Sequence, residues 1–341
     1  MRARRIVYLL LREAGIGLAL VFMAVAFSVL APRFASMANL TNILTQISIN
    51  TVISVGMTFV ILLGGIDLSV GSVLALATVV GGLVITSERL DPGAAIALAV
   101  LASTLTGGLC GLFNGFVCER WKIHSFVVTL GMLNIARGAA LQISNSRTIF
   151  SFPDAFNEVG SATLLGVPVI FLMALALVLA GRFVLARTVF GRMIYAIGNN
   201  EEAVRLSGHA PAVFKVAAFT VCGAMVGLAA VMYMMRLAIA SPILGVGFEL
   251  NAIAAVVIGG TSMSGGKGSM VGTFLGASIM GVLNNGLLLL GMGDFARQMV
   301  TGLVIVVAVI IDKYRARALA RLAFEPVPEA PALGSGPASA S

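Results

Sequence analysis

The chain has 341 residues, of which 59% are hydrophobic and 11% are charged, and its formal net charge is +8 at pH 7. A typical soluble domain carries roughly 25% charged residues, so the composition excludes a soluble globular protein and predicts an all-α polytopic membrane protein. The basic residues are scattered between apolar segments instead of lining one aromatic-rich face, which argues against nucleic acid as a partner and favours membrane topology as their explanation.

Apolar runs of about 20 residues predict ten transmembrane helices. The first run follows the arginine-rich segment 1–13 and lacks a small-residue cleavage site, so it is predicted to stay in the membrane as a retained helix. The eighth run is the weakest, and eight crossings remain an alternative if two short runs are re-entrant. The runs are 14–31, 44–64, 67–87, 94–118, 124–143, 166–186, 213–234, 249–264, 270–291 and 296–312.

The distribution of basic residues predicts which ends of these helices are cytoplasmic. With a cytoplasmic N-terminus, the outer side receives only Arg33, Arg89, Arg137, Arg147, Arg236 and Arg297 of the 22 lysines and arginines, which is the bias of the positive-inside rule. Both termini are then cytoplasmic. The predicted organisation is a cytoplasmic N-terminus (1–13), one transmembrane domain (14–312), and a basic cytoplasmic end with a disordered tail (313–341).

The largest predicted outer loop runs from Ser144 to Leu165 and can present a small structured surface to a partner outside. A second polar interruption, from Arg187 to Lys215, is predicted to be cytoplasmic. Within it, Asn199 is predicted to cap a short helix, with Glu202 reaching back as in a capping box, and Gly208 is predicted to end it in a left-handed conformation.

A helix of about eight residues spans only about 12 Å and is unstable in water unless it packs against something. Two readings are open. The helix is either an ordinary connector that packs on its own protein or a contact with a separate cytoplasmic subunit.

No motif predicts chemistry on this chain. The segment Ser264–Ser269 lacks the glycine and the hydroxyl residue that a phosphate-binding loop requires, and a tight turn is the default there. Cys110, Cys118 and Cys222 have no paired spacing, so neither a disulfide framework nor a metal site is predicted. Since no nucleophile and base or metal-ligand cluster is present, no catalytic residue is predicted.

Glycine-rich breaks and buried polar residues predict a polar pathway. The breaks are 64–72 and 259–266, and irregular backbone at membrane depth is typical of a cavity or pathway, with close helix packing as the alternative. Asp67 is either a functional carboxylate or the N-cap of the third span. The candidate pathway residues are Asp67, Ser69, Glu249, Asn251, Thr261, Asn284 and Asn285.

Glycines also recur at every fourth residue in two spans. Gly107, Gly111 and Gly115 form one row, and Gly272 and Gly276 form another. We expect these rows to be close helix contacts.

Between about Asn39 and Asp312, the chain resembles the permease subunits of bacterial ATP-binding-cassette sugar importers of the ribose, xylose, arabinose and galactose group. The matching segments are Gly56–Ile61, Gly65–Ser72, Ala196–Glu201, Arg205–Gly208, Glu249–Val256, Gly259–Ser262, Gly265–Gly268 and Leu283–Leu287. His209 departs from the family pattern, which tends to an aliphatic residue there.

The resemblance implies a type II-like importer permease that forms no covalent bond itself. It implies a second permease copy, a cytoplasmic ATPase subunit that binds ATP and Mg²⁺, and a periplasmic sugar-binding protein, with the lipid bilayer as surroundings and no cofactor on this chain. The segment 187–215 then carries the coupling helix, with Ala203 and Leu206 on its contact face. The implied coupling residues are Asn199, Asn200, Glu201, Glu202, Ala203, Arg205, Leu206, Ser207 and Gly208.

Three other functions remain open at this point. They are a permease for branched-chain amino acids, an ion-coupled secondary transporter, for which Asp67 and Glu249 are the only evidence, and a membrane enzyme, which the missing catalytic cluster disfavours. The sequence does not identify the substrate.

Overall fold

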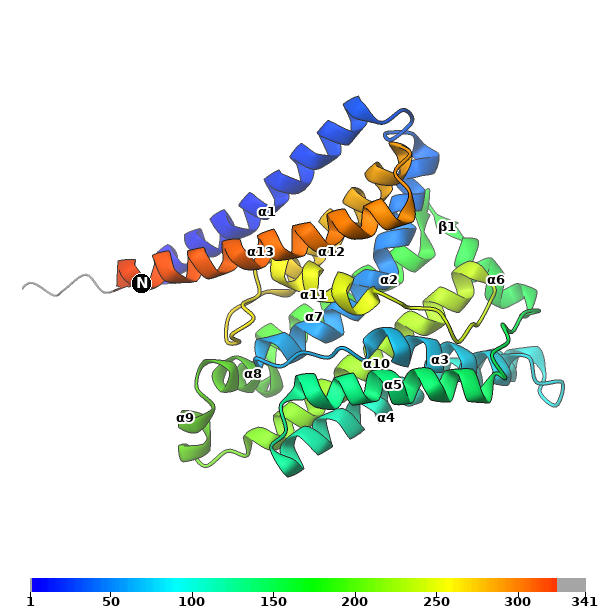
Figure 1. Ribbon diagram of the computed structural model, residues 1–341, viewed down its shortest axis with the longest axis horizontal. Helices are drawn as coiled ribbons and strands as arrows, with labels where there is room; N and C mark the ends of the chain where they lie inside the picture. The colour runs from blue at the N-terminus through cyan, green and yellow to red at the C-terminus, as the bar shows by residue number, and fades with distance from the viewer. Residues whose placement is uncertain (1, 324–341) are drawn as a thin grey trace, which may run out of the picture.

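The structure is a computed structural model that describes the backbone of residues 2–323 and the side chains of residues 14–310 and Tyr314. The regular secondary structure of that part of the chain is helical apart from one hairpin of two short antiparallel strands and one isolated bridge (Figure 1). The helices are α1 (Arg2–Leu30), α2 (Met37–Leu62), α3 (Val70–Ile85), α4 (Pro92–Trp121), α5 (Ser125–Ile143), α6 (Asp154–Ser161), α7 (Val169–Arg187), α8 (Val189–Asn199), α9 (Glu201–Leu206), α10 (Pro211–Leu237), α11 (Phe248–Ile258), α12 (Met270–Leu289) and α13 (Asp294–Ala323), and the strands are β1 (Thr163–Leu164) and β2 (Val167–Pro168). The tail that was predicted to be disordered, residues 325–341, lies outside the described residues.

Each of the ten predicted spans overlaps one helix, and these helices are α1 to α5, α7 and α10 to α13. Within the described residues, six of these helices are long and apolar enough to cross a bilayer, namely α2, α4, α5, α7, α10 and α12. The apolar part of α1 (Ala14–Leu30), α3 and α11 are shorter. With 11 residues, α11 covers only about 16 Å of a hydrocarbon layer roughly 30 Å thick. The predicted eighth span, 249–264, is therefore too long, because the helix ends at Ile258 and a glycine turn follows.

The two glycine-rich breaks are irregular backbone, as predicted, and they contact each other. Gly64, after α2, and Gly260, after α11, both have a φ of +79°, a left-handed conformation that glycine adopts without strain. The N–H of Gly266 donates a hydrogen bond to the carbonyl of Leu62 at 2.8 Å. The segment between α11 and α12 is thereby bonded to the end of α2.

Glycines also let pairs of long helices approach closely, as the spacing predicts. A Cβ atom added to Gly107 in α4 would lie 2.1 Å from the carbonyl oxygen of Gly223 in α10. A Cβ atom on Gly276 in α12 would lie 2.0 Å from the carbonyl oxygen of Ala255 in α11. Only glycine fits at these crossings, which is how small residues drive helix association in a bilayer.

We expect Gly107→Ala to destabilise the protein by about 1–3 kcal/mol, because the methyl group would push α10 away from α4. Gly108→Ala is the matched control, since its Cβ atom would meet only Ala224 Cβ at 3.9 Å, an ordinary contact. The melting temperature of the detergent-solubilised protein should fall for the first variant and hold for the second. Equal melting temperatures would contradict the close crossing.

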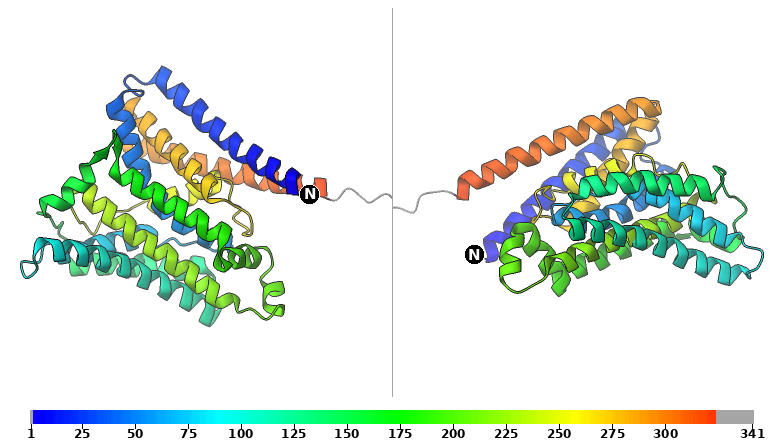
Figure 2. Two further views of the ribbon diagram at one scale, coloured as in Figure 1. Left: turned by 180° about the vertical axis from the view of Figure 1, so that it is seen from behind. Right: turned by 60° about the horizontal axis from the view of Figure 1, so that its bottom comes forward.

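The two predicted polar surfaces lie at opposite ends of the molecule. α8 and α9 lie at the end where α1 begins, whereas α6 and the β1–β2 hairpin lie at the other end in all the views (Figures 1 and 2). The predicted outer loop, 144–165, holds α6 and β1, and it is anchored by a bridge between Ile149 and Ala240. The loop therefore has the structured surface that was expected of it.

Candidate functional site

The polar segment from Arg187 to Lys215 forms two short helices with a break between them. α8 ends at Asn199, and Asn200 is extended, with φ −160° and ψ 97°. The side chain of Asn200 accepts a hydrogen bond from the N–H of Ala203 at 3.0 Å, so Asn200 is the N-cap of α9. The prediction that Asn199 is the cap and Glu202 completes a capping box is wrong, because the true cap places Ala203 three residues later, and alanine has no acceptor.

Asn199 and Glu202 make other contacts instead. The Nδ2 atom of Asn199 donates to the carbonyls of Tyr195 at 2.7 Å and Gly266 at 3.2 Å, which links the end of α8 to the segment before α12. Glu202 forms an exposed ion pair with Arg205 within α9, and this carboxylate raises the pKa of the Arg205 guanidinium above its ordinary value. The start of α9 is thus fixed by the cap at Asn200 and by the contacts that Asn199, at the end of α8, makes.

α9 has six residues, fewer than the eight predicted, and it buries one side chain. Val204 packs with Met193 and Ile197 of α8. Ala203 and Leu206, which share a face because they are three residues apart, are both exposed, and Leu206 is 79% exposed. Gly208 then ends the helix with a φ of +82°, as predicted. The helix therefore presents an apolar side chain to its surroundings at one end of the molecule.

A polar cavity of about 220 Å³ lies between α2, α10, α11 and α12. Its polar lining consists of Gln46, Asn50, Tyr233, Arg236, Asn251 and Asn284. The Oδ1 atom of Asn50 is buried and has no hydrogen-bond partner among the described residues. Amide and phenol groups of this kind both donate and accept hydrogen bonds, so the lining can bind a solute rich in hydroxyl groups.

Only two of the predicted pathway residues, Asn251 and Asn284, line this cavity. Asn285 is buried and exchanges two hydrogen bonds with Asn39, at 2.9 and 3.0 Å, so it joins α12 to α2. Thr261 is fully buried beside the turn before α12. The role that the structure displays for Asn285 is therefore interhelical hydrogen bonding.

Asp67 belongs to a second buried cluster. Its Oδ1 atom accepts hydrogen bonds from the N–H of Ser69 at 2.9 Å and from the hydroxyl of Ser69 at 2.6 Å. The Nδ2 atom of Asn114 in α4 donates to the same hydroxyl at 3.1 Å. The N-cap of α3 is Ser69, so the alternative that Asp67 itself caps this helix is wrong; Asp67 forms a local turn around the cap.

Glu249 lies where α3 and α11 begin beside each other. Its Oε1 atom accepts a hydrogen bond from the N–H of Gly247 at 3.2 Å. A Cβ atom on Gly71, in the first turn of α3, would lie 2.2 Å from the carbonyl oxygen of Gly245 and 2.3 Å from the Glu249 carboxylate. The carboxylate is therefore close to the N-terminal ends of two short helices, where the helix dipole favours negative charge.

The cavity residues Gln46, Asn50, Tyr233 and Arg236 were not predicted from the sequence. Gln46 and Asn50 are four residues apart and therefore lie on one face of α2, a spacing that could have identified them. Asn114 also stands alone among apolar residues of α4. Arg236 had been counted only as an outer basic residue.

The chain is similar to known transport proteins over most of its length. Residues 39–309 match the family model described as branched-chain amino acid transport system / permease component. The ribose import permease protein RbsC of Haemophilus influenzae is 42% identical over 302 residues, which cover 87% of this chain and 92% of that protein. The D-allose transport system permease protein AlsC of Escherichia coli is 36% identical over 288 residues (84% and 87%), and the L-arabinose ABC transporter permease protein AraH of Azospirillum brasilense is 33% identical over 315 residues (92% and 91%). No solved structure matches the chain.

Proposed function

Because this chain belongs to the family of branched-chain amino acid transport system permease components, and within it is the permease component of an ABC sugar importer, we propose that it moves a monosaccharide or related polyol across the bacterial inner membrane. It is a multi-pass membrane protein and a transport subunit, not an enzyme. The relatives are named for ribose, allose and arabinose, which are neutral and rich in hydroxyl groups. Such solutes are bound through hydrogen-bond donors and acceptors on the surrounding side chains.

The proposed path for the solute passes through the polar cavity between α2, α10, α11 and α12. The observation that carries this proposal is the amide lining, in which Asn50 retains a buried oxygen without a partner among the described residues. Such an oxygen is costly to bury and is satisfied by a sugar hydroxyl or a water molecule. In this proposal Asn251 and Asn284 contact the solute, whereas Asp67, Ser69, Glu249, Thr261 and Asn285 support the helices around the path.

We propose ten crossings with both termini in the cytoplasm. The positions of α8 and α9 at the end where α1 begins support a cytoplasmic α9, given the basic N-terminal segment. In this arrangement α3 and α11 are shorter than a full crossing and are completed by irregular backbone. The single transmembrane domain, 14–312, would then carry the coupling segment 187–215 on its inner face and the 144–165 loop on its outer face.

The proposed partners follow from this orientation. α9 binds a cytoplasmic ATPase subunit, which holds ATP and Mg²⁺, and the loop with α6 faces a periplasmic sugar-binding protein. A second permease copy completes the complex in the bilayer. Asn199 does not contact the ATPase in this proposal but bonds the end of α8 to Gly266. The contact residues proposed for the ATPase are Asn200, Glu201, Glu202, Ala203, Arg205, Leu206, Ser207 and Gly208.

We expect Asn284→Leu to lower sugar uptake about tenfold, the effect of losing roughly one hydrogen bond to the solute and leaving an apolar wall. Uptake of radiolabelled sugar into proteoliposomes containing the full complex measures this. Asn134→Leu is the matched control, because Asn134 also bonds a carbonyl four residues back but lies exposed on α5, outside the cavity. Equal uptake by both variants would remove the cavity from the path.

The same assay separates the remaining alternatives. Uptake that continues when the ATPase subunit is omitted would indicate an ion-coupled transporter. Competition by leucine or isoleucine, but not by sugars, would indicate an amino acid permease. Sugar uptake that requires both ATP and the ATPase subunit supports the proposed function.

A further inference from the structure

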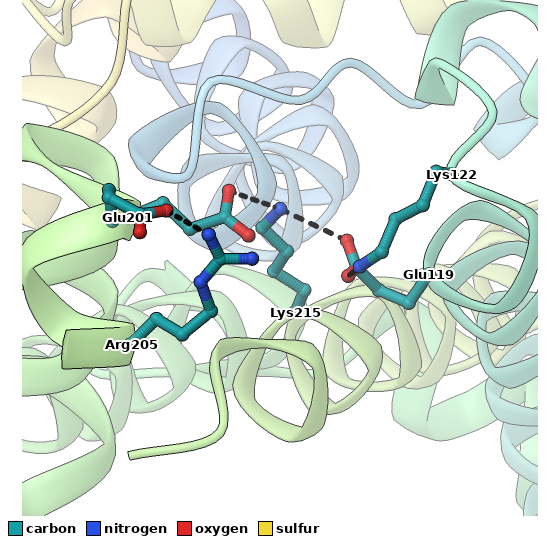
Figure 3. Close-up of polar contacts among 6 residues, drawn as sticks. Glu119, Lys122, Glu201, Arg205 and Lys215 are labelled. Carbon is teal, nitrogen blue, oxygen red and sulfur yellow. Dashed lines mark hydrogen bonds and ion pairs between the residues drawn. The ribbon is translucent and has the colours of Figure 1, made fainter. Parts of the chain in front are cut away.

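One lysine at the cytoplasmic end joins three helices that are separate in the sequence. The Nζ atom of Lys215, in the first turns of α10, lies 3.0 Å from Oε1 of Glu119, near the end of α4. The same atom lies 2.6 Å from Oε2 of Glu201, the first residue of α9 (Figure 3). Lys215 is therefore a direct ionic link between the small polar helix and two long apolar helices.

The ion pairs form a chain with balanced charge. Lys122 holds the second oxygen of Glu119 at 2.8 Å, so the order is Lys122, Glu119, Lys215 and Glu201. Arg205 does not join this chain, because its guanidinium pairs with Glu202 inside α9. Removing the Lys215 ammonium would leave Glu119 paired with Lys122, whereas Glu201 would lose its ion pair but is 46% exposed and can be hydrated.

The pairs of Lys215 are more sheltered than the other ion pairs at this end. The side chain of Glu119 is 11% exposed and that of Lys215 is 20% exposed, whereas both partners of the Arg205–Glu202 pair are more than half exposed. Exposed pairs are screened by salt and contribute little, while partly buried pairs are screened much less. The ion pair between Lys215 and Glu119 is therefore expected to persist when α9 is displaced.

α9 has few other attachments on the side of α10. Its one buried side chain, Val204, clusters with Met193 and Ile197 of α8, and Phe214 of α10 packs against the same cluster. After Leu206 the chain passes through the exposed residues 207–210 before α10 begins at Pro211. The bond from Glu201 to Lys215 adds an ionic link from the start of α9 to α10, and Glu119 extends that link to α4, which crosses α10 at glycine contacts.

We propose that Lys215 is a positioning residue that makes α9, α10 and α4 move as one unit, so that a displacement of α9 by the ATPase reaches the α4–α10 pair. This inference rests on the proposed role of α9 as the ATPase contact. Lys215 contacts neither the solute nor the ATPase. Loss of the Lys215 ammonium would uncouple sugar transport from ATP hydrolysis without preventing assembly of the complex.

The test uses the reconstituted complex of permease, ATPase and sugar-loaded binding protein. Lys215→Met should keep basal ATP hydrolysis and ATPase binding, but lower the stimulation by loaded binding protein, and the sugar moved per ATP, by about fivefold or more. Glu119→Gln, which removes the charge of the partner of Lys215 on α4, should do the same. Lys215→Arg, which keeps the charge, should restore both quantities, and Lys122→Met, which touches only Glu119, should leave both unchanged.

Two results would overturn the inference. One is wild-type stimulation and sugar-to-ATP ratio in Lys215→Met; the other is an uncoupling by Lys215→Arg as large as that by methionine, which would indicate a packing role. Leu206→Arg distinguishes this failure from that of the proposed function. If Leu206→Arg abolishes stimulation while Lys215→Met does not, α9 is the contact and only the role of Lys215 is wrong.

Discussion

Leu206→Arg is expected to abolish the stimulation of ATP hydrolysis by sugar-loaded binding protein while leaving the amount of permease in the membrane unchanged. Leu206 is 79% exposed at the end of α9, so the substitution meets no neighbour within the isolated chain. Against a partner it would lose about 1.5–3 kcal/mol of leucine burial and would force an unpaired charge into an apolar contact. The expected loss of affinity is therefore about two orders of magnitude.

Co-purification of the ATPase subunit with tagged permease and the hydrolysis rate of the complex measure this effect. For the co-purification, Leu165→Arg is a suitable control, because Leu165 is 97% exposed in the turn of the hairpin at the opposite end of the molecule. That control should leave ATPase binding intact. If Leu206→Arg retains both binding and stimulation, α9 is an ordinary connector.

The second large effect is expected from Gly198→Val, which should reduce uptake at least about tenfold. Gly198 lies in the last turn of α8, where three segments of backbone meet. A Cβ atom there would lie 1.9 Å from the carbonyl oxygen of Leu62 and 2.5 Å from the nitrogen of Gly266, the two groups that bond α2 to the segment before α12. A larger side chain would separate them and cost about 1–3 kcal/mol of overpacking.

Uptake and membrane abundance should be measured together for this variant, because a fall in uptake at normal abundance separates a coupling defect from misfolding. Gly131→Ala is the control, since a Cβ atom at Gly131 would meet nothing within 4 Å. Normal uptake by Gly198→Val would mean that the junction of α2, α8 and the α11–α12 segment does not transmit motion.

The helices could be predicted because the signal for each is local. Length and apolarity identify ten runs, and glycine spacing identifies crossings such as that of Gly107 with α10. The cap of α9 could not be resolved, because Asn199 and Asn200 are adjacent and cap equally well in isolation. Only the contact of Asn199 with Gly266, far away in the sequence, decides between them.

Part of the cavity lining could be predicted, because two of its residues also have a local signal in the sequence. Asn251 and Asn284 were identified as polar residues in apolar surroundings, but their meeting with Asn50 and Arg236 depends on how four helices pack. The role of Asn285 could not be distinguished from that of Asn284 in the sequence, because the two amides are neighbours. Helix rotation directs one toward the cavity and the other toward Asn39.

The shortness of α11 also bears on how the protein is made. Machinery that inserts nascent chains selects segments by hydrophobic length, and the 11 residues of Phe248–Ile258 fall well below the roughly 20 that are recognised singly. We therefore expect α11 to enter the bilayer only when α12 has emerged from the ribosome, with its backbone contact at Gly276 already able to form. Synthesis of α10, α11 and α12 would then end in one cooperative insertion step, and a chain truncated before α12 would leave α11 at the membrane surface.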